Sequence, residues 1–586
     1  MEEWLVYNKR ADFNGNAKKH GIDPVTARII RNREIIEDED IRKYLSGGIG
    51  DLYNPHLLKD GDKLCEILIQ KIEEGKAVRI IGDYDIDGVM SSYILLTALE
   101  RLGAEVSVAI PHRMTDGYGL NANLIQNAKA DGIDTILTCD NGIAAISEIA
   151  LAKSYGMTVL VTDHHEVMFE ETETGKKYLE SQADAIVNPH QIACNYPYKE
   201  LCGAGVAWKI VCLLYEKKQI DFTEAEELLE YVAFATVGDI VSLTDENRIL
   251  VKEGLKRIHH SKNIGMQALI AKCGLEMDRI GSYHFGFVLG PCINAGGRLD
   301  TAQRSLELFR AKDVEEASRI AGELVALNEE RKELTQKGVD LALSICEEKG
   351  YDKDLVIVLY LPTVHESIAG IIAGRVREVY HRPVFVLSDS EQGVKGSGRS
   401  IEAYSMYDKL SECKELLNKF GGHKMAAGLS LEAEKIEQFR QKMNGNCELS
   451  EKDLHETIHI DVPMPIDYPT IELLQEFELL APFGKENERP VFADRDIAIR
   501  RMWVIGKNRN VLRLDLISSN GKTVQGIYFG DIDAFLQYFS EKFSEEEVEN
   551  CLHGRENELR MLAVYAPSIN RYRDMESVQV EIRYYK

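Results

Sequence analysis

From Ala77 onward, apolar residues alternate between short continuous runs and longer amphipathic stretches. The runs VRII, TILTC and TVLVT have the length of buried strands. The stretches between them have the period of helices, as in the one that carries Val89, Tyr93 and Leu96 on one face. Strands that alternate with helices of about 10 to 15 residues predict a parallel, doubly wound sheet.

The pattern is different in the other parts of the chain. In the N-terminal part, apolar residues recur at the spacing of helices between capping residues, and the alternation of apolar and polar residues that is typical of strands is absent from the sequence. A mainly helical stretch and a second alternating block, with the runs DLVIVLYLP and PVFVLSD, follow the first sheet. The last part has the texture of an all-β barrel, including two strands around the turn Asn520-Gly521. We therefore expect a helical leader, an α/β domain with a helical extension, a second α/β domain and a C-terminal barrel, at residues 1–74, 75–345, 346–452 and 453–586.

Composition places the chain among ordinary globular proteins. It has 586 residues, of which 44% are hydrophobic and 28% are charged. The eleven cysteines are scattered and form no CxxC pair, so we expect reduced thiols in the core. The sequence has no apolar run long enough to span a membrane and no signal-peptide pattern, and we expect a cytoplasmic protein. The net charge of −26 means that any contact with nucleic acid needs locally basic surfaces.

Acidic residues and histidines follow the apolar runs. In a parallel sheet the carboxyl ends of the strands meet at one edge, where ligands bind. VRIIG is followed by three aspartates within five residues, and a further apolar run, YVAFATVG, is also followed by an aspartate. The residues concerned are Asp83, Asp85, Asp87, Asp140, Asp163, His164, His165 and Asp239. We expect them to converge.

Convergent carboxylates repel one another unless cations neutralise them. Oxygen ligands with one or two imidazoles suit Mg²⁺ or Mn²⁺, and two such ions sharing a carboxylate can hold a phosphoryl group. A calcium loop of the EF-hand type needs Glu at its twelfth position, where this chain has Ile94. Taken singly, Asp140 could be a helix cap and the histidine pair a structural feature.

The motifs DYDIDG, DNG, DHH and VGD, in this order, resemble those of the DHH phosphoesterase superfamily. The segments LCGAGVAWK, LGPCINAGGRLDTA, HESIAGIIAGRVRE, KGSGRSI, FGGHKMAAG and APFGKENERPVF are similar to one branch of it, the RecJ exonucleases. The resemblance covers about residues 75 to 495, and the C-terminal β region lies where that family has its oligonucleotide-binding barrel. It implies a DHH domain and a DHH-associated domain around a cleft, followed by this barrel.

The resemblance assigns roles to the convergent residues. It implies two divalent cations, Mn²⁺ or Mg²⁺, as cofactors, and a metal group of Asp83, Asp85, Asp87, Asp140, His164 and Asp239. Asp140 is expected to bridge the cations, and His165, Asp87 and Asp140 form the expected catalytic group. His165 is expected to contact the scissile phosphate, with a supporting role beside His164 as the alternative, and Asp163 to orient its neighbours.

The resemblance also implies contacts with the substrate. The glycine-rich KGSGRS is expected to form a backbone nest for a phosphate through Ser397 and Arg399. Together with Arg113 and Arg298 these residues are expected to bind a terminal 5′-phosphate, and His423 to face the same cleft. The chain departs from the pattern at GPCIN, where Cys292 replaces an expected basic residue. One contact with the DNA backbone is in doubt there.

The barrel region interleaves aromatic and basic residues, as in proteins that bind single strands by stacking bases. Some of these aromatic residues are expected to belong to the barrel core instead. The candidates are Trp503, Lys507, Arg509, Tyr528, Phe529, Tyr565, Arg571, Tyr572 and Arg573.

The function implied is degradation of single-stranded DNA from 5′ to 3′ to 5′-mononucleotides by two-metal hydrolysis, in DNA repair and recombination. Two alternatives stay open: a DHH-type oligoribonuclease, cyclic-dinucleotide phosphodiesterase or pyrophosphatase, and a catalytically silent scaffold. The presence of the barrel region disfavours the first alternative, and the complete set of acids and histidines disfavours the second. The resemblance implies single-stranded DNA as the partner, with a single-strand-binding protein or a recombination helicase as further partners. We expect a monomer.

Overall fold

The computed structural model describes residues 2–113, 117, 119–172, 175–390, 393–506, 509–572 and 575–586. These residues form two compact units. One contains Tyr53–Val241 and Glu253–Glu456, and the other contains Glu2–Leu52, Ser242–Lys252 and Thr457–Lys586. The four domain boundaries expected from the sequence stay predictions.

The first unit begins with the predicted parallel sheet, which is confirmed. Its five strands lie in the order β3-β2-β4-β5-β8, all parallel. They are β2 (Val78–Ile81), β3 (Val106–Ala109), β4 (Thr135–Cys139), β5 (Thr158–Thr162) and β8 (Ala185–Val187). A separate hairpin, β6 (Phe169–Thr172) and β7 (Gly175–Tyr178), lies between β5 and β8 in sequence.

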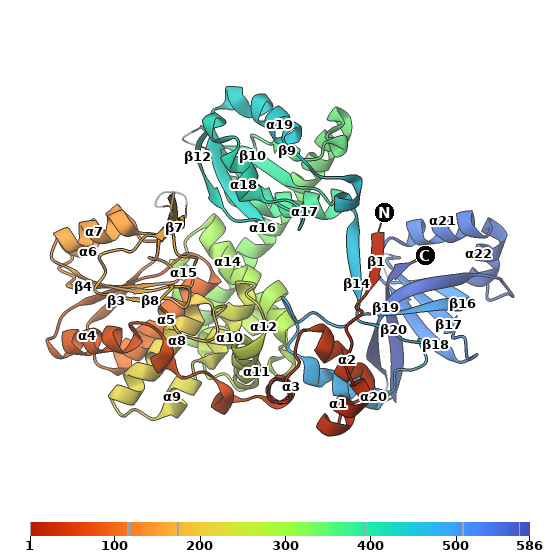
Figure 1. Ribbon diagram of the computed structural model, residues 1–586, viewed down its shortest axis with the longest axis horizontal. Coiled ribbons are helices and arrows are strands. Elements are labelled where there is room, and N and C mark those ends of the chain that lie inside the picture. Colours follow the sequence, from red (N-terminus) through yellow and green to blue (C-terminus); the bar gives the residue numbers. More distant parts are fainter. Residues whose placement is uncertain are drawn as a thin grey trace. The chain divides into compact units, whose positions relative to one another are not determined.

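Helices cover both faces of this sheet (Figure 1). One face packs on α6 (Ala122–Ala130) and α7 (Ile146–Ser154), whose apolar side chains form a common core with those of β4 and β5. On the other face lie α4 (Gly61–Glu73), α5 (Ile86–Arg101) and α8 (Gly203–Lys217). Because both faces are covered, the strands are almost entirely apolar.

The helical stretch after this sheet is also confirmed. It ends in α16, a helix of 36 residues. Its helices are α9 (Phe222–Glu226), α10 (Leu229–Gly238), α11 (Asp245–Ile258), α12 (Ile264–Lys272), α13 (Ser282–His284), the π-helix η4 (Phe285–Leu289), α14 (Gly290–Leu299), α15 (Gln303–Arg310) and α16 (Val314–Lys349). Helices α12, α14 and α15 all pack against α16.

A second sheet completes this unit, with the order β12-β13-β11-β10-β9. Its strands are β9 (Ile357–Tyr360), β10 (Val384–Ser390), β11 (Gly393–Arg399), β12 (Leu417–Gly422) and β13 (Ala426–Leu431). Helix α17 (Glu366–Tyr380) packs with α16 on one face, and α18 (Met406–Ser411) and α19 (Ile436–Gly445) contribute to the core on the other.

The second unit contains the predicted barrel. Strands β16, β17, β18, β20 and β19 pair in that order, and β19 pairs again with β16, which closes the barrel. They are β16 (Phe492–Ile505), β17 (Val511–Ile517), β18 (Thr523–Tyr528), β19 (Arg560–Tyr572) and β20 (Met575–Tyr585). The short strand β15 (Val462–Pro463) pairs in parallel with the start of β16. The predicted barrel is confirmed. The region also contains three helices that the pattern did not predict: α20 (Ile471–Phe477), α21 (Ile532–Lys542) and α22 (Glu545–Leu552). Their aromatic residues fill part of the barrel core.

The expected leader contributes to both units. Its last helix, α4, packs on the first sheet, whereas residues 2–52 belong to the second unit and pack into the barrel core. The helices of residues 2–52 are α1 (Phe13–His20), α2 (Pro24–Asn32) and α3 (Asp38–Ser46). The leader is not entirely helical, since β1 (Glu2–Val6) pairs with β14 (Glu456–Ile460). This strand lies far in sequence from its partner, so local pattern gives no signal for it.

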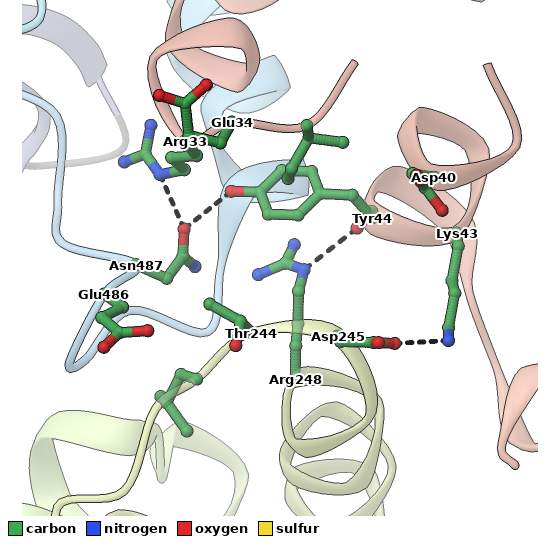
Figure 2. Close-up of a pocket in the computed structure, with 12 residues that line it drawn as sticks. Arg33, Glu34, Asp40, Lys43, Tyr44, Thr244, Asp245, Arg248, Glu486 and Asn487 are labelled. Carbon is green, nitrogen blue, oxygen red and sulfur yellow. Dashed lines mark hydrogen bonds and ion pairs between the residues drawn. The ribbon is translucent and has the colours of Figure 1, made fainter. Parts of the chain in front are cut away.

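A buried arginine joins the three segments of the second unit. The guanidinium of Arg248 lies over the Tyr44 ring at 4.0 Å and donates to the carbonyl oxygens of Tyr44, Leu479 and Leu480 at 3.0, 2.6 and 2.7 Å. Burial lowers the pKa of Arg248 to about 10. Figure 2 shows this residue in a cavity of about 240 Å³ between the leader, the start of α11 and Asn487. Since its donors are bonded to backbone oxygens, Arg248 has a structural role.

The helices in the described part of the chain include none that is both long and apolar enough to cross a membrane.

Candidate active site

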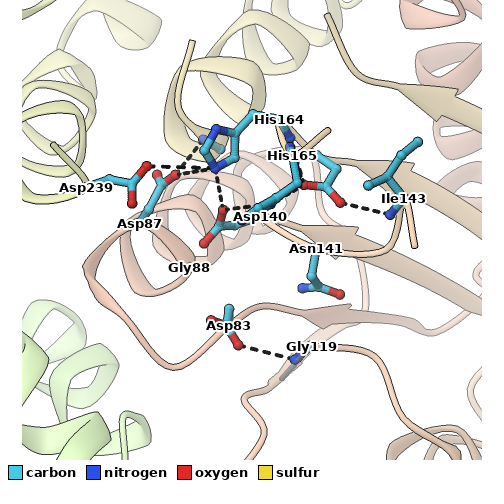
Figure 3. A network of polar contacts seen from close by, with 12 residues as sticks. Asp83, Asp87, Gly88, Gly119, Asp140, Asn141, Ile143, His164, His165 and Asp239 are labelled. Atoms are coloured by element: carbon cyan, nitrogen blue, oxygen red, sulfur yellow. Dashed lines mark hydrogen bonds and ion pairs between the residues drawn. The ribbon is translucent and has the colours of Figure 1, made fainter. Parts of the chain in front are cut away.

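Three of the predicted acids lie where β2 is followed by α5: Asp83 and Asp85 are in the connecting loop, which we call the acidic loop, and Asp87 is in the first turn of α5. Asp85 is the N-cap of α5 and accepts from the amides of Asp87 and Gly88 at 3.0 and 3.1 Å. Asp83 is buried and accepts from the Gly119 amide at 3.3 Å (Figure 3). Its second oxygen has no hydrogen-bond partner among the described residues. An orphaned buried carboxylate oxygen is costly unless a ligand such as a cation binds there.

Asp87 has a different environment from the other two. It is fully buried, and its two oxygens accept from the amides of Gly203 and Ala204, at 2.6 and 2.8 Å, at the start of α8. Asp87 therefore fixes α8 to the start of α5, and the N-terminus of α8 stabilises its charge. One of the same oxygens lies 3.5 Å from His164 Nε2, so Asp87 also faces the predicted metal group.

Asp140 follows β4 in a left-handed conformation, with φ of 60°. The next residue, Asn141, holds the turn by donating to the carbonyl oxygens of Ile81 and Cys139 at 3.0 and 2.8 Å. A Cβ atom at Gly203 would lie 2.7 Å from Cβ of Asp140, so glycine is required where α8 approaches this residue. An aspartate adopts this conformation more readily than most residues, and the turn directs Asp140 toward the predicted metal group.

The two histidines after β5 are held by Asp163. Its carboxylate accepts from the amides of Ile143, His164 and His165 and from Nδ1 of His165, at 2.7 to 3.1 Å. The His164 ring points with Nε2 toward Asp140 Oδ1 at 3.0 Å and Asp239 Oδ2 at 3.8 Å. The His165 side chain is more exposed, at 44%. These contacts agree with the orienting role expected for Asp163, which stays a prediction.

Asp239 reaches the group by an unexpected route. The run YVAFATVG is not a strand but the helix α10, and Asp239 is its C-cap. Every residue from Leu229 to Thr236 is buried. A helix that is apolar on all sides has no amphipathic period, which is why it could not be distinguished from a buried strand by sequence.

The carboxylates raise one another's pKa values. Burial, followed by the charge of Asp85, raises the pKa of Asp83. Burial, followed by the charges of Asp87, Asp85, Asp239 and Asp83, raises the pKa of Asp140. Burial opposes the protonation of His165, but the hydrogen bond and charge of Asp163 outweigh it and raise the pKa of this histidine to about 9. Negative charge is therefore in excess among these carboxylates, and divalent cations would neutralise it.

The donor atoms fit two cations that share a carboxylate. Three sets have ligand atoms within 4.8 Å of one another: Asp83, Asp85 and Asp140; Asp87, His164 and Asp239; and Asp140, His164 and His165. Asp140 belongs to one set with the acidic loop and to another with the histidines. This position agrees with its predicted bridging role, and the oxygen-rich donor set suits Mn²⁺ or Mg²⁺.

Three of the predicted arginines form a group next to the acidic loop. The arginine group consists of Arg113, Arg298 and Arg399. The Arg113 guanidinium lies 5.0 Å from the ring centre of Tyr84, which is between Asp83 and Asp85. Helix α14 touches the same loop, since Asn294 Oδ1 accepts from the Ile86 amide at 2.8 Å. This helix ends near Arg298, which donates to the Ser367 carbonyl oxygen at 2.9 Å.

Three of the predicted arginines lie close enough to repel one another. Burial, followed by the charges of Arg113, Arg331 and Arg399, lowers the pKa of Arg298 to about 10. Burial and the charges of Arg377 and Arg113 also lower the pKa of Arg399. A partly buried cluster of like charges is a candidate site for an anion. Sequence reasoning missed Arg331, Arg377 and Asn294, although LNEERKE and GPCIN contain two of them.

The phosphate nest expected at KGSGRS is wrong. Residues 393–399 are the regular strand β11, which pairs with β10 on one side and β13 on the other. Cβ atoms at Gly396 and Gly398 would lie 2.3 Å from Leu387 and 2.6 Å from Phe385, so these glycines make room for core side chains. Ser397 and Arg399 are on the opposite face of the strand from these glycines, where only side chains can contact a ligand.

His423 and Cys292 also have defined environments. His423 is in the turn between β12 and β13 and accepts from the Met425 amide through Nδ1 at 3.2 Å. Its contact with substrate stays a prediction. Cys292 is buried, with its sulfur 3.9 Å from that of Cys273 and 3.5 Å from Asn328 Nδ2. In this chain the position therefore belongs to the core and offers no charge to a phosphate.

The barrel candidates divide into core and surface. Tyr565 is fully buried and donates to the Met464 carbonyl oxygen at 2.9 Å, and Tyr528 packs on Phe535. Trp503 lies between the guanidinium groups of Arg501 and Arg513, 4.6 and 5.4 Å from its ring. The remaining candidates on described backbone are Phe529, which is exposed, Arg509 and Arg571, which pairs with Glu576. Lys507, Arg573 and the side chain of Tyr572 lie outside the described residues.

Three family profiles match the chain. The DHH family N-terminal domain matches residues 77–236, the DHHA1 domain matches 353–448 and the RecJ OB domain matches 460–584. A solved structure, RecJ from Thermus thermophilus in complex with Mn²⁺, matches with a TM-score of 0.82 and 25% identity over 100% of this chain and 79% of that one. An exonuclease RecJ bound to manganese matches with a TM-score of 0.58 and 31% identity over 68% of this chain and 98% of that one.

Curated relatives agree with these matches. The single-stranded-DNA-specific exonuclease RecJ of Bacillus subtilis is 33% identical over 84% of this chain, which spans 62% of that protein. The protein of the same name from Escherichia coli is 32% identical over 87% of this chain and 89% of its own length. The predicted resemblance is confirmed, and the chain belongs to the RecJ family of single-stranded-DNA-specific exonucleases.

Proposed function

We propose that this chain is a metal-dependent exonuclease that degrades single-stranded DNA from 5′ to 3′ and releases 5′-mononucleotides, in DNA repair and recombination. The observation that carries the proposal is the junction of two oppositely charged groups at Tyr84. Asp83 and Asp85 flank this residue on the acidic side, and Arg113 lies over its ring. A terminal phosphate bound by arginines would thus lie beside the cations that act on the next phosphodiester.

Each residue has a role in this proposal. Mn²⁺ or Mg²⁺ ions, which are present in the solved RecJ relatives, would activate water and stabilise charge on the phosphate. Asp140 holds the two halves of the site together, because it shares donor sets with both. His165, held through Nδ1 by the Asp163 carboxylate, contacts the scissile phosphate and donates a proton to the leaving oxygen.

Polarity follows from the arginine group. Arg113, Arg298 and Arg399 bind the terminal 5′-phosphate, so cleavage occurs at a fixed distance from that end. Lys and Arg contacts with phosphates also supply most of the affinity of an acidic protein for DNA. The barrel, with Trp503 between two arginines, adds a surface on which bases of the single strand stack. A single-strand-binding protein or a helicase as partner and the monomeric state stay predictions.

The test is a degradation assay with Mn²⁺ and end-labelled DNA. Single strands and duplexes carry either a 5′-phosphate or a 5′-hydroxyl. We expect mononucleotides from the 5′ end of single strands, fastest with a 5′-phosphate, and little cleavage of blunt duplex. Preferred hydrolysis of dinucleotides over long strands would favour the phosphodiesterase or oligoribonuclease alternative, and release of label from the 3′ end first would contradict the polarity.

A further inference from the structure

Two aromatic side chains in the first unit are unusually exposed. Tyr283 and Phe287 are 64% and 70% exposed, which makes them the most exposed aromatic residues in the described part of the chain. Their rings stack on each other, with centroids 5.1 Å apart and planes at 25°. Adjacent exposed rings are costly in water, and such patches on a protein usually mark a binding surface.

The local fold holds this pair in solvent. Tyr283 and Phe287 are four residues apart on the helical segment formed by α13 and the π-helix η4. The neighbouring residue Phe285 points the other way, is fully buried and packs on Phe234 of α10 at 4.9 Å. One face of the segment is therefore anchored in the core while the other carries the two rings. A π-helical turn is uncommon and is found frequently at functional sites.

The segment adjoins the active site on both sides. A Cβ atom at Gly286 would lie 3.5 Å from Val237, which is two residues before Asp239, and one at Gly290 would lie 3.5 Å from Ile86, which directly follows the acidic loop. The same helical stretch continues into α14, which reaches Arg298. The exposed pair is therefore continuous with elements of both the acidic and the arginine groups.

The residue after Asp239 supports this placement. Ile240 is 68% exposed and has a positive φ of 58°, which is unfavourable for a β-branched residue. The tertiary structure thus holds an apolar side chain in solvent directly beside a candidate metal ligand. A surface of this kind next to a hydrolytic site suits the substrate better than an unrelated partner.

We propose that Tyr283 and Phe287 form a stacking platform for the bases of single-stranded DNA, on the 3′ side of the scissile phosphate. Every base has an apolar face, so aromatic stacking binds a strand without sequence preference. A duplex hides these faces within its own stack, so the platform also favours single strands. This inference rests on the proposed function and extends it with a binding site for the part of the strand not yet cleaved.

The test follows the logic of a double-mutant cycle. The two rings are removed from the protein, the bases are removed from the DNA, and binding is measured for all four combinations. Two proteins are compared, and both carry Asp140→Ala to prevent cleavage. One of them also carries Tyr283→Ala and Phe287→Ala, and the other keeps both rings. Each is titrated with two fluorescent strands in the presence of Mn²⁺. One strand is normal, and the other has abasic sites after its first two nucleotides. We expect the protein that keeps both rings to bind the normal strand about 5-fold or more tightly than the abasic strand. The protein without the rings should lose most of this difference in affinity.

Controls separate the platform from general damage. Phe222→Ala removes another exposed aromatic residue, 42% exposed on α9, and is expected to keep the full preference. Phe287→Trp should retain the preference, and its fluorescence should be quenched by the normal strand more than by the abasic one. In proteins with Asp140 intact, the double variant should lower the ratio of kcat/KM for a long strand to that for a dinucleotide.

An equal preference for the normal strand with and without the two rings would overturn the inference, and would leave the patch as a docking site for a protein. Degradation of single strands by the unchanged protein is measured in parallel. If that protein does not degrade them, the proposed function fails. If it does and the cycle shows no coupling, only the platform fails.

Discussion

The carboxylates around Asp140, the acidic group, and the arginines around Arg298, the arginine group, carry opposite charges. In both groups, burial and neighbouring like charges shift the pKa values toward the neutral form. Around Asp140, buried carboxylates raise one another's pKa values. Around Arg298, partial burial and the charges of neighbouring arginines lower the pKa of the guanidinium group. Each arrangement is unfavourable by itself, since burial and like charge both oppose ionisation. The comparison suggests one rule for both groups: a ligand of opposite charge would relieve the repulsion, and we propose a cation for the first group and a phosphate for the second.

Arg248 is a buried arginine that differs from those of the arginine group, because protein groups already bond its guanidinium. It is buried, and its guanidinium donates to three backbone carbonyl oxygens and lies over Tyr44. Burial is the main cause of its lowered pKa, and the charge of Arg33 contributes least. A buried charge that is fully bonded stabilises the fold, whereas a cluster of mutually repelling charges is prepared for a ligand.

The largest expected effect comes from the acidic group. Asp140→Asn should lower the rate of strand cleavage by more than about 10³-fold, because the residue belongs to the donor sets on both sides of the site. The measurement is the initial rate of mononucleotide release at saturating Mn²⁺. Asp131→Asn, at a position with a 58% exposed side chain, is the matched control. A rate within about 10-fold of the unchanged protein, with contaminating nuclease excluded, would show that Asp140 is not a bridging ligand.

The arginine group should act on the end of the strand rather than on the chemistry. Arg399→Gln should reduce the preference for a 5′-phosphate over a 5′-hydroxyl by about 100-fold, because it removes a charge-assisted contact from a partly buried site. Competition between the two substrates measures this ratio. Arg319→Gln, 59% exposed on α16, should leave the ratio unchanged. If Arg399→Gln slows both substrates equally, the end-recognition role is excluded.

A substitution at Asp163 tests whether the orientation of His165 contributes to catalysis without contributing to metal binding. Asp163→Asn should lower kcat by about 10-fold or more, since His165 loses the carboxylate that holds its ring and favours its protonated form. KM for the strand and the affinity for Mn²⁺, measured by calorimetry, should change much less. A loss of Mn²⁺ affinity as large as the loss of kcat would instead make Asp163 part of the metal site.

The smallest effect concerns stability. Saturating Mn²⁺ should raise the melting temperature of the metal-free protein by about 5 °C, because the ions bind only the folded arrangement of carboxylates. Metal-free Asp140→Asn should melt higher than the metal-free unchanged protein, since one buried charge is removed from the group. Its response to Mn²⁺ should be smaller. If the variant melts lower without metal, mutual repulsion of the carboxylates is not the source of the effect.

The acidic half of the site could be predicted well from sequence. Asp83, Asp85, Asp140 and His164 follow short apolar runs, and the parallel order of those strands brings their ends to one edge. Alternation of strands and helices is a local signal, and the topology of a doubly wound sheet then determines where the ends meet. The same reasoning predicted the closed barrel but missed its helices, because strands dominated the pattern there.

The tertiary structure alone decided the rest. Asp239 reaches the metal group from a helix rather than a strand, and Arg331 joins the arginine group from α16. The glycines of β11 accommodate core side chains and not a phosphate, and Tyr283 and Phe287 are exposed because their neighbour Phe285 is buried. Local sequence determines the period and the end of each element. Which of its side chains face a ligand depends on contacts between residues far apart in the chain, and no local pattern contains them.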